Sequence, residues 1–231
     1  MANINYLNNF IQPVADDSTF WKHQITEHAL FLSNKLNPNT ASELKHEATQ
    51  FYLMSVNNRT SESSYNANYM NLFYAFLETI RNKIPDIPNI NLEISTDDFY
   101  DLVRHMILEH TYVVRLLNGQ MTVKEELLFW LQESAEHMLL LTNLLPEGQL
   151  REESGRIAEI LRETRDAALD NPAYLLNSSN IIKASLEAAA LINNDIISGR
   201  VQIDQQMLFH EIREANRGLE RINSLLQGIS Q

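Results

Sequence analysis

One stretch of the sequence occurs twice, and this repeat limits the folds that the chain can adopt. Residues 20–32 read FWKHQITEHALFL and residues 129–141 read FWLQESAEHMLLL. In both copies Phe-Trp is followed by Glu-His at the same distance, and the second copy begins almost half of the 231-residue chain after the first. Such spacing is typical of the duplication of one structural unit. The sequence therefore predicts two units of similar design.

Apolar residues recur at helical spacing along most of the chain. Trp21, Ile25 and His28, for example, fall on one face of a single helix. The tetrapeptides TASE at 40–43 and TVKE at 122–125 are capping boxes, which mark the start of a helix. No segment alternates polar and apolar residues for long enough to predict a strand. We expect helices at about residues 18–36, 40–57, 64–84, 97–118, 122–145, 148–169, 178–197 and 202–227.

Short connections join these helices in two sets of four. An antiparallel four-helix bundle is a common packing for four helices joined in this way. The sequence therefore predicts an all-α fold, formed by tandem duplication of two antiparallel four-helix bundles. We expect an N-terminal arm at 1–17, a first bundle at 18–120 and a second bundle at 121–231.

The charge and hydropathy of the chain limit the classes of partner that we expect for it. The formal net charge is −12, from 30 acidic and 18 basic residues. Nucleic acids and anionic membrane surfaces bind basic patches, so neither is expected as a partner. The N-terminus lacks the basic start and apolar run of a signal peptide, and no stretch approaches the roughly 18 apolar residues of a membrane span. We expect a cytoplasmic protein.

Glutamate and histidine occur together at matched positions in the two halves. On the first helix of each half they are adjacent, and on the last helix glutamate follows histidine by four residues. A spacing of four places both side chains on one side of a helix, so that both can reach one ion. Metal binding would compensate the cost of burying these polar groups. The candidate ligands are Glu27, His28, His105 and Glu109 in the first half, and Glu136, His137, His210 and Glu214 in the second.

The residue types limit which metal such a site can hold. The chain has no cysteine, so any metal must be bound by His, Asp or Glu. Imidazole with carboxylate favours iron, manganese or zinc over calcium or magnesium, and a carboxylate-rich ligand set favours iron or manganese over zinc. Di-iron and di-manganese bundle proteins bind their ions with Glu and His that project inward from facing helices.

Two arrangements of these ligands remain open. Each half could hold its own ion, or the two halves could face each other and form one dinuclear site from all the candidate ligands. Glu27 and His28 are adjacent, and adjacent residues point about 100° apart around a helix. The two side chains need not bind the same ion, and one of them could orient a ligand instead.

Other histidines have a simpler interpretation. His23 and His46 lie among charged neighbours and are expected on solvated helix faces. His110 follows Glu109, whereas Ala215 follows Glu214, so a structural role is the better interpretation of His110. Two further acids are additional candidate ligands, Glu133 and Glu211.

The arrangement of these motifs resembles a known group of proteins. Phe-Trp followed by Glu-His on the first helix of each half, with His and Glu on the last, is similar to an uncharacterised bacterial metalloprotein family found mainly in Bacillus and related Firmicutes. The similarity covers about residues 18–228. It implies tandem four-helix bundles with metal held by His and Glu, and it implies no established reaction. Ala215 and the unmatched His23 depart from the pattern and leave the halves chemically unequal. The wider likeness to ferritin-like bundles is an analogy.

No sequence feature names a substrate, and hypotheses from different classes remain. A dinuclear carboxylate site would support redox or oxygen chemistry, and the same ligands would serve metal storage or sensing without turnover. A metal-free alternative interprets the Glu and His residues as buried hydrogen-bond networks or surface pairs. The protein would then be a helical interaction module whose outer face binds a partner or a second copy of the chain in a homodimer.

Overall fold

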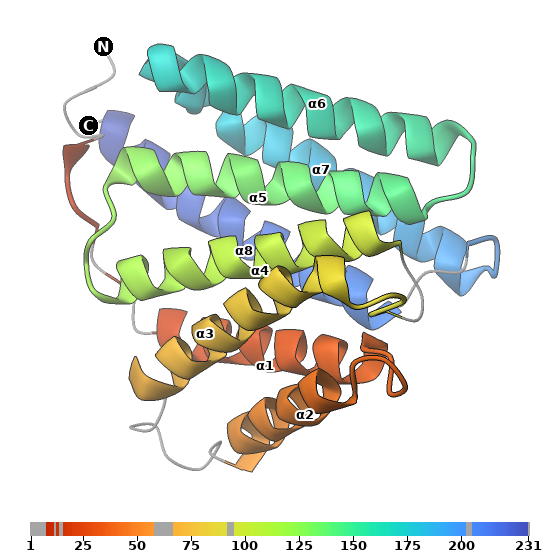
Figure 1. Cartoon of the computed structure of the whole chain (residues 1–231). Coiled ribbons are helices and arrows are strands. Elements are labelled where there is room, and N and C mark those ends of the chain that lie inside the picture. The colour runs from red at the N-terminus through yellow and green to blue at the C-terminus, as the bar shows by residue number, and fades with distance from the viewer. Residues whose placement is uncertain are drawn as a thin grey trace. The chain divides into compact units, whose positions relative to one another are not determined.

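The chain folds into α-helices (Figure 1). The computed structural model describes residues 8–11, 13, 16–57, 67–91, 95–201 and 205–230. Within these ranges there are eight α-helices and no β-strand, so the all-α prediction is confirmed. The α-helices are α1 (Asp17–Lys35), α2 (Ser42–Asn57), α3 (Ala67–Lys83), α4 (Thr96–Leu117), α5 (Val123–Leu144), α6 (Gln149–Asp170), α7 (Ser178–Ile197) and α8 (Gln205–Ser230). Two short 3-10 helices, η3 (Ile84–Asp86) and η4 (Pro172–Asn177), lie in the connections before α4 and α7.

The helix bounds lie within a few residues of the predicted ranges. Some predicted residues fall outside the described ones: 1–7, 12, 14 and 15 of the expected arm, and the first residues of two expected helices, 64–66 and 202–204. The capping box at 122–125 forms, because the Thr122 hydroxyl accepts from the Glu125 N–H and the Glu125 carboxylate accepts from the Thr122 N–H. The capping box expected at 40–43 does not mark the start of the helix, because α2 begins later, at Ser42.

The chain divides into two compact units. Gln12–Gly119 forms the N-terminal unit with α1–α4, and Gln120–Gln231 together with Met1–Ile11 forms the C-terminal unit with α5–α8. Within each unit consecutive helices run antiparallel (Figure 1). Each unit therefore contains the four helices that its half of the sequence predicts.

Main-chain hydrogen bonds explain why the start of the chain belongs to the C-terminal unit. The Val123 N–H donates to the Asn9 carbonyl at 3.0 Å, and the Ile11 N–H donates to the Met121 carbonyl at 2.9 Å. Ile11 is buried, with 6% of its surface exposed. The segment before α1 thus packs against the turn that begins α5.

Aromatic side chains join the helices of the N-terminal unit. Trp21 on α1 packs edge-on against Tyr112 on α4, with ring centroids 5.5 Å apart. Phe51 on α2 makes ring contacts at 5.1 to 5.7 Å with three residues of α3, Tyr69, Phe73 and Phe76. The aromatic stripe of α3 is therefore part of the core, as its helical spacing indicates.

A buried ion pair and a glycine set the distance between α5 and α8 in the C-terminal unit. Arg221 on α8 donates two hydrogen bonds to the Glu126 carboxylate on α5, at 2.6 and 2.9 Å. The Trp130 indole N–H donates to the same carboxylate at 3.4 Å. Gly218 lies against the Trp130 ring, because a Cβ atom built there would be 2.6 Å from the ring carbon Cε3. This close approach holds Glu214, one turn earlier on α8, near α5.

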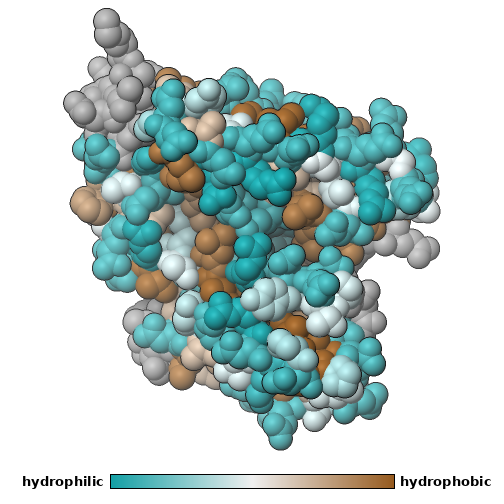
Figure 2. Space-filling view, turned by 45° about the horizontal axis from the view of Figure 1, so that its top comes forward, coloured by the Kyte–Doolittle hydropathy of each residue, from teal (hydrophilic) through white to brown (hydrophobic). Residues whose placement is uncertain are grey.

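The surface drawn in Figure 2 is mostly hydrophilic, and its hydrophobic residues lie in separate small groups. This surface is consistent with the large acidic excess of the chain, a net charge of −12. Among the residues that the structure describes, no helix is both long and apolar enough to cross a membrane.

The close packing at Gly218 makes a prediction about stability. Gly218→Ala forces its new Cβ into the Trp130 ring, and we expect a loss of about 1–3 kcal/mol in the free energy of unfolding, since overpacked cores cost about that much. Gly155→Ala on α6 is the matched control, because its Cβ would lie 3.4 Å from Thr142 Cγ2. Both variants gain the same helix propensity, about 1 kcal/mol. Urea unfolding followed by circular dichroism measures both, and an equal rise in stability would contradict the contact.

Candidate metal centres

Two imidazoles meet one carboxylate inside the N-terminal unit. His28 Nε2 from α1 lies 2.9 Å from Glu109 Oε2, and His105 Nε2 lies 2.8 Å from Glu109 Oε1. Glu109 has no exposed surface, and His28 and His105 are 2% and 7% exposed. We call these three residues the N-terminal cluster. Each oxygen of the carboxylate thus faces one imidazole.

Helical spacing explains why these side chains meet. His28 follows Trp21 and Ile25 on the buried face of α1, so the apolar face that packs α1 into the unit also carries the imidazole inward. His105 and Glu109 are one turn apart on α4, which begins where the Ser95 hydroxyl accepts from the Asp98 N–H. The cluster is therefore built on two rigid helices.

The surroundings of Glu109 keep its side chain ionised. Burial alone would raise the pKa of this carboxyl, but the facing His28 and His105 imidazoles, through their charge and their hydrogen bonds, hold the pKa well below its usual value. A carboxylate anion is therefore present in a fully buried position. Such an anion needs compensating positive charge, which either imidazolium groups or a metal cation can supply.

A second cluster of the same residue types lies inside the C-terminal unit. Glu133 Oε1 and Glu214 Oε2 each lie 3.3 Å from His137 Nε2, and the same Glu214 oxygen lies 3.3 Å from His210 Nε2. All four side chains are buried, with exposures between 0% and 5%. We call these four residues, from α5 and α8, the C-terminal cluster. It contains one more carboxylate than the N-terminal cluster.

The spacing of the donor atoms fits a metal ion. Two ligand atoms about 2.1 Å from one ion and at right angles to each other lie about 3 Å apart. The imidazole nitrogen to carboxylate oxygen distances in the two clusters are 2.8 to 3.3 Å. In the C-terminal cluster, ligand atoms of Glu133, His137 and Glu214 all lie within 4.8 Å of one another. These buried His/Glu clusters could therefore hold a metal ion.

The structure brings together only part of the predicted ligand set. His28, His105, Glu109, His137, His210 and Glu214 lie in the two clusters. Glu27 is instead half-buried beside His23, whose Nδ1 lies 3.6 Å from its carboxylate, and Glu136 is half-buried and accepts a hydrogen bond from Gln132. Adjacent residues point about 100° apart around a helix, so a histidine that faces inward turns the glutamate before it to the side.

Glu133, an additional candidate in the sequence, lies beside His137, with its Oε1 3.3 Å from His137 Nε2. It is 1% exposed and lies one turn before His137 on the same face of α5. The signal for Glu133 is present in the sequence, because glutamate and histidine four residues apart share a helix face. Glu211, the other additional candidate, is also buried, at 3% exposed.

The remaining histidines lie apart from the clusters or beside them. His23 and His46 are exposed, as their charged neighbours indicate. His110 is buried, and its ring centroid lies 6.0 Å from that of Phe73 and 5.8 Å from that of Tyr74 on α3. Burial lowers the pKa of His110 to about 4, and the Met70 backbone offsets part of this effect. His110 is therefore a neutral packing residue at neutral pH.

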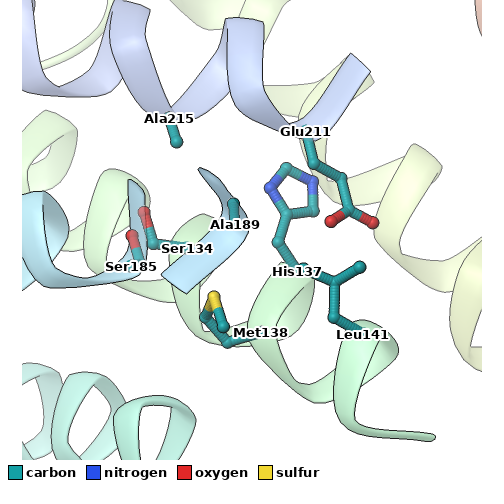
Figure 3. A pocket seen from close by; sticks show the side chains of 8 residues that line it. All are labelled: Ser134, His137, Met138, Leu141, Ser185, Ala189, Glu211 and Ala215. Carbon is teal, nitrogen blue, oxygen red and sulfur yellow. The ribbon is translucent and has the colours of Figure 1, made fainter. Parts of the chain in front are cut away.

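A small cavity lies beside His137 in the C-terminal unit (Figure 3). Its volume is about 10 Å³, which is room for about one water molecule. Figure 3 shows the His137 ring and the Glu211 carboxylate on one side of the cavity and the Ser134 and Ser185 hydroxyls on the other. Residues of α5, α7 and α8 line the cavity, and most of the lining surface is apolar.

Comparison with known proteins identifies the fold. No protein-family model matches the chain, and no curated protein matches it. Among solved structures, the chain is similar to an uncharacterized protein from Bacillus cereus G9241, with a TM-score of 0.75 and 19% sequence identity. The match covers 91% of this chain and 90% of that one. At this identity the likeness shows the fold alone, and it is consistent with the Bacillus-type resemblance of the sequence.

The environment of His110 predicts an unusual titration. Its imidazole is expected to protonate near pH 4, because burial disfavours the charged form. A lowered histidine pKa stabilises the fold above the unfolded pKa of about 6.5, and this contribution is lost as the pH falls from about 6.5 to about 4. NMR titration of the histidine Cε1–H resonances measures it, with His110→Gln to assign the signal. Titration of His110 near pH 6.5 would contradict its burial.

Proposed function

We propose that each unit binds one transition-metal ion through its buried cluster, with iron or manganese favoured over zinc. The observation that carries this proposal is the fully buried Glu109 carboxylate between two imidazoles, at 2.9 and 2.8 Å. The Glu214 carboxylate, with two imidazoles at 3.3 Å, supports the same proposal for the C-terminal unit. A divalent cation compensates a buried carboxylate while the imidazoles stay neutral, which is the form that binds metal.

The proposed ligands differ from the set that the sequence analysis favours. In the N-terminal unit they are His28, His105 and Glu109, and in the C-terminal unit they are Glu133, His137, His210 and Glu214. Glu27 and Glu136 are left out of the set, because both are half-buried and lie beside other polar side chains. The two proposed sites are chemically unequal, since only the second contains two carboxylates.

The donor types support the choice of metal. Imidazole and carboxylate without thiolate suit iron, manganese and zinc, and a larger share of carboxylate favours iron and manganese. Bound iron or manganese would supply redox chemistry, and the same ligands would also serve storage or sensing of the metal. The chain's own contribution is to hold the donors on rigid helices and to exclude bulk water from them.

The metal-free alternative explains the same distances as hydrogen bonds. Imidazole and carboxylate 2.8 to 2.9 Å apart form good charge-assisted hydrogen bonds, and the lowered pKa of Glu109 is consistent with them. Under this alternative the clusters specify helix packing, and an outer face of the protein binds a partner. The two functions differ in one measurable quantity, the metal content of the purified protein.

The proposed origin of the two sites is a tandem duplication. Support comes from the repeated Phe-Trp and Glu-His stretch, and from the presence in each unit of four helices with an imidazole on the first and a His…Glu pair on the last. Ala215 after Glu214 and His110 after Glu109 mark where the two units have diverged.

The proposal predicts the metal content of the protein and of two variants. Protein purified without a metal-affinity tag should contain about two iron or manganese ions per chain by elemental analysis. Glu109→Gln and Glu214→Gln keep the side-chain shape and remove the anion, so each should lose about one ion. Glu47→Gln, at an exposed position of α2, is the control and should lose none.

Two outcomes would contradict this prediction. A metal-free protein whose melting temperature does not respond to added Fe²⁺ or Mn²⁺ favours the interaction module. Loss of all metal from either variant alone contradicts one ion per unit.

Substitution of two glutamates on α5 tests which of them binds the metal ion. Glu133→Gln should weaken Mn²⁺ binding in the C-terminal unit about 10-fold or more, because substitutions beside a bound metal commonly cost 10–100-fold in affinity and a ligand costs at least as much. Glu136→Gln, three residues away on the same helix, should leave the affinity unchanged. Isothermal titration calorimetry with Mn²⁺ measures both. The opposite order of effects would restore Glu136 to the ligand set.

A further inference from the structure

The buried ion pair of the C-terminal unit lies on the same helix faces as the C-terminal cluster. On α5, Glu133 follows Glu126 by seven residues, and on α8, Arg221 follows Glu214 by seven. Seven residues are about two helical turns, so the two members of each pair share one face of their helix. The ion pair and the cluster are therefore two levels of one interface between α5 and α8, about 10 Å apart along the helix axes.

The equal spacing ties both levels to a single register of the antiparallel helices. In this register Glu214 Oε2 lies 3.3 Å from His137 Nε2, two turns from the ion pair. A shift of α8 by one turn would move its donor atoms about 6 Å along the axis, away from those of α5. One ion could not then contact both, because ligand atoms lie about 2.1 Å from the metal.

A second arginine means that charge alone does not choose this register. Arg217 lies one turn nearer the start of α8 than the arginine of the ion pair, and its side chain is only 11% exposed. A one-turn shift would bring its guanidinium to Glu126. Gly218 opposes this shift, because Glu214 would then replace it beside the Trp130 ring. The close contact at the glycine thus excludes the register that the second arginine would allow.

The geometry of the ion pair fixes orientation as well as distance. Arg221 Nε donates to Glu126 Oε1 at 2.6 Å, and Arg221 Nη2 donates to Oε2 at 2.9 Å. Such a forked contact is directional, because both N–H groups must meet both oxygens at once. Apolar contacts have no such preferred direction. The pair can therefore specify a register that apolar packing alone leaves free to vary.

The N-terminal unit carries a buried acid at the matched position. In each unit an acid precedes the tryptophan by four residues and the cluster histidine by eleven: Asp17, Trp21 and His28 in the first unit, and Glu126, Trp130 and His137 in the second. The two acids are 1% and 0% exposed. A buried acid at this level is thus common to both units.

We propose that Glu126 and Arg221 position the ligands of the C-terminal cluster, because their forked contact fixes the register in which donor atoms of α5 and α8 share one ion. The inference rests on the proposed function, since it assigns these two residues a role in metal binding. Neither residue belongs to the cluster, so each acts through the helix that carries it. Loss of the pair should therefore weaken metal binding even where the fold is equally stable.

A double substitution separates positioning from stability. Glu126→Leu/Arg221→Met replaces the ion pair by apolar side chains of similar size, and such replacements are often neutral or stabilising. The Glu109→Gln protein, which keeps the C-terminal cluster intact, is the background. Isothermal titration calorimetry should show Mn²⁺ affinity about 10-fold lower or more, as for substitutions that disturb ligand orientation, at a melting temperature that is not lowered. The visible spectrum of bound Co²⁺, which reports coordination geometry, should change as well.

Two controls show whether the effect is specific to this pair and this cluster. Glu153→Leu/Arg156→Met removes an exposed forked pair on α6 and should leave the Mn²⁺ affinity unchanged. The double substitution at the buried pair, placed in the Glu214→Gln protein, should leave binding at the N-terminal cluster unchanged. If the apolar double variant does not fold, Arg221→Lys replaces it, because lysine keeps the charge and loses the fork.

The outcomes separate this inference from the function on which it rests. A folded variant that lacks the forked contact but keeps its Mn²⁺ affinity and Co²⁺ spectrum overturns the inference and leaves metal binding intact. An equal loss of affinity at the N-terminal cluster also overturns it, because the effect would not act through α5 and α8. Failure of the unsubstituted protein to bind Mn²⁺ overturns the proposed function and this inference with it.

Discussion

The structure depends on how a buried carboxylate is compensated. Glu109 and Glu214 have no exposed surface, and each lies within 3.3 Å of two imidazole nitrogens. An isolated carboxylate in such a position would cost several kcal/mol, so the fold tolerates it only where positive charge meets it. Two imidazoles can provide that charge as imidazolium groups, and a divalent cation can provide it while both imidazoles stay neutral. The choice between these states decides whether the clusters are structural or functional.

The helices around each cluster hold the donors in place through different contacts. In the N-terminal unit the aromatic packing of Trp21 on Tyr112 joins the first and last helices. In the C-terminal unit the Arg221–Glu126 ion pair and the missing side chain of Gly218 bring α8 against α5. In both units an imidazole of the first helix lies opposite a His…Glu pair of the last helix. Similar donor geometry thus rests on unlike packing in the two units.

Helical periodicity predicted the eight helices and the residues that face inward, because burial of an apolar stripe is a local property of the sequence. It also predicted His28 and His137, which continue those stripes. The sequence also contained the four-residue spacing of Glu133 and His137, but the repeated Glu-His pair directed the prediction to Glu136, which lies about 100° around the helix from His137. The contact between Arg221 and Glu126 joins residues 95 positions apart, and the cavity depends on side-chain volumes from three helices. Neither could be read from spacing along one helix.

Anomalous X-ray diffraction from crystals of the protein, recorded on both sides of the iron and manganese absorption edges, would show whether the clusters hold metal. We expect one anomalous peak within about 2.0–2.2 Å of the Glu109 carboxylate and the His28 and His105 nitrogens, and another at the same distance from Glu214. Electron density with no anomalous peak in either cluster, and with each imidazole hydrogen-bonded directly to its carboxylate, would contradict it. The clusters would then be packing networks of a metal-free helical protein.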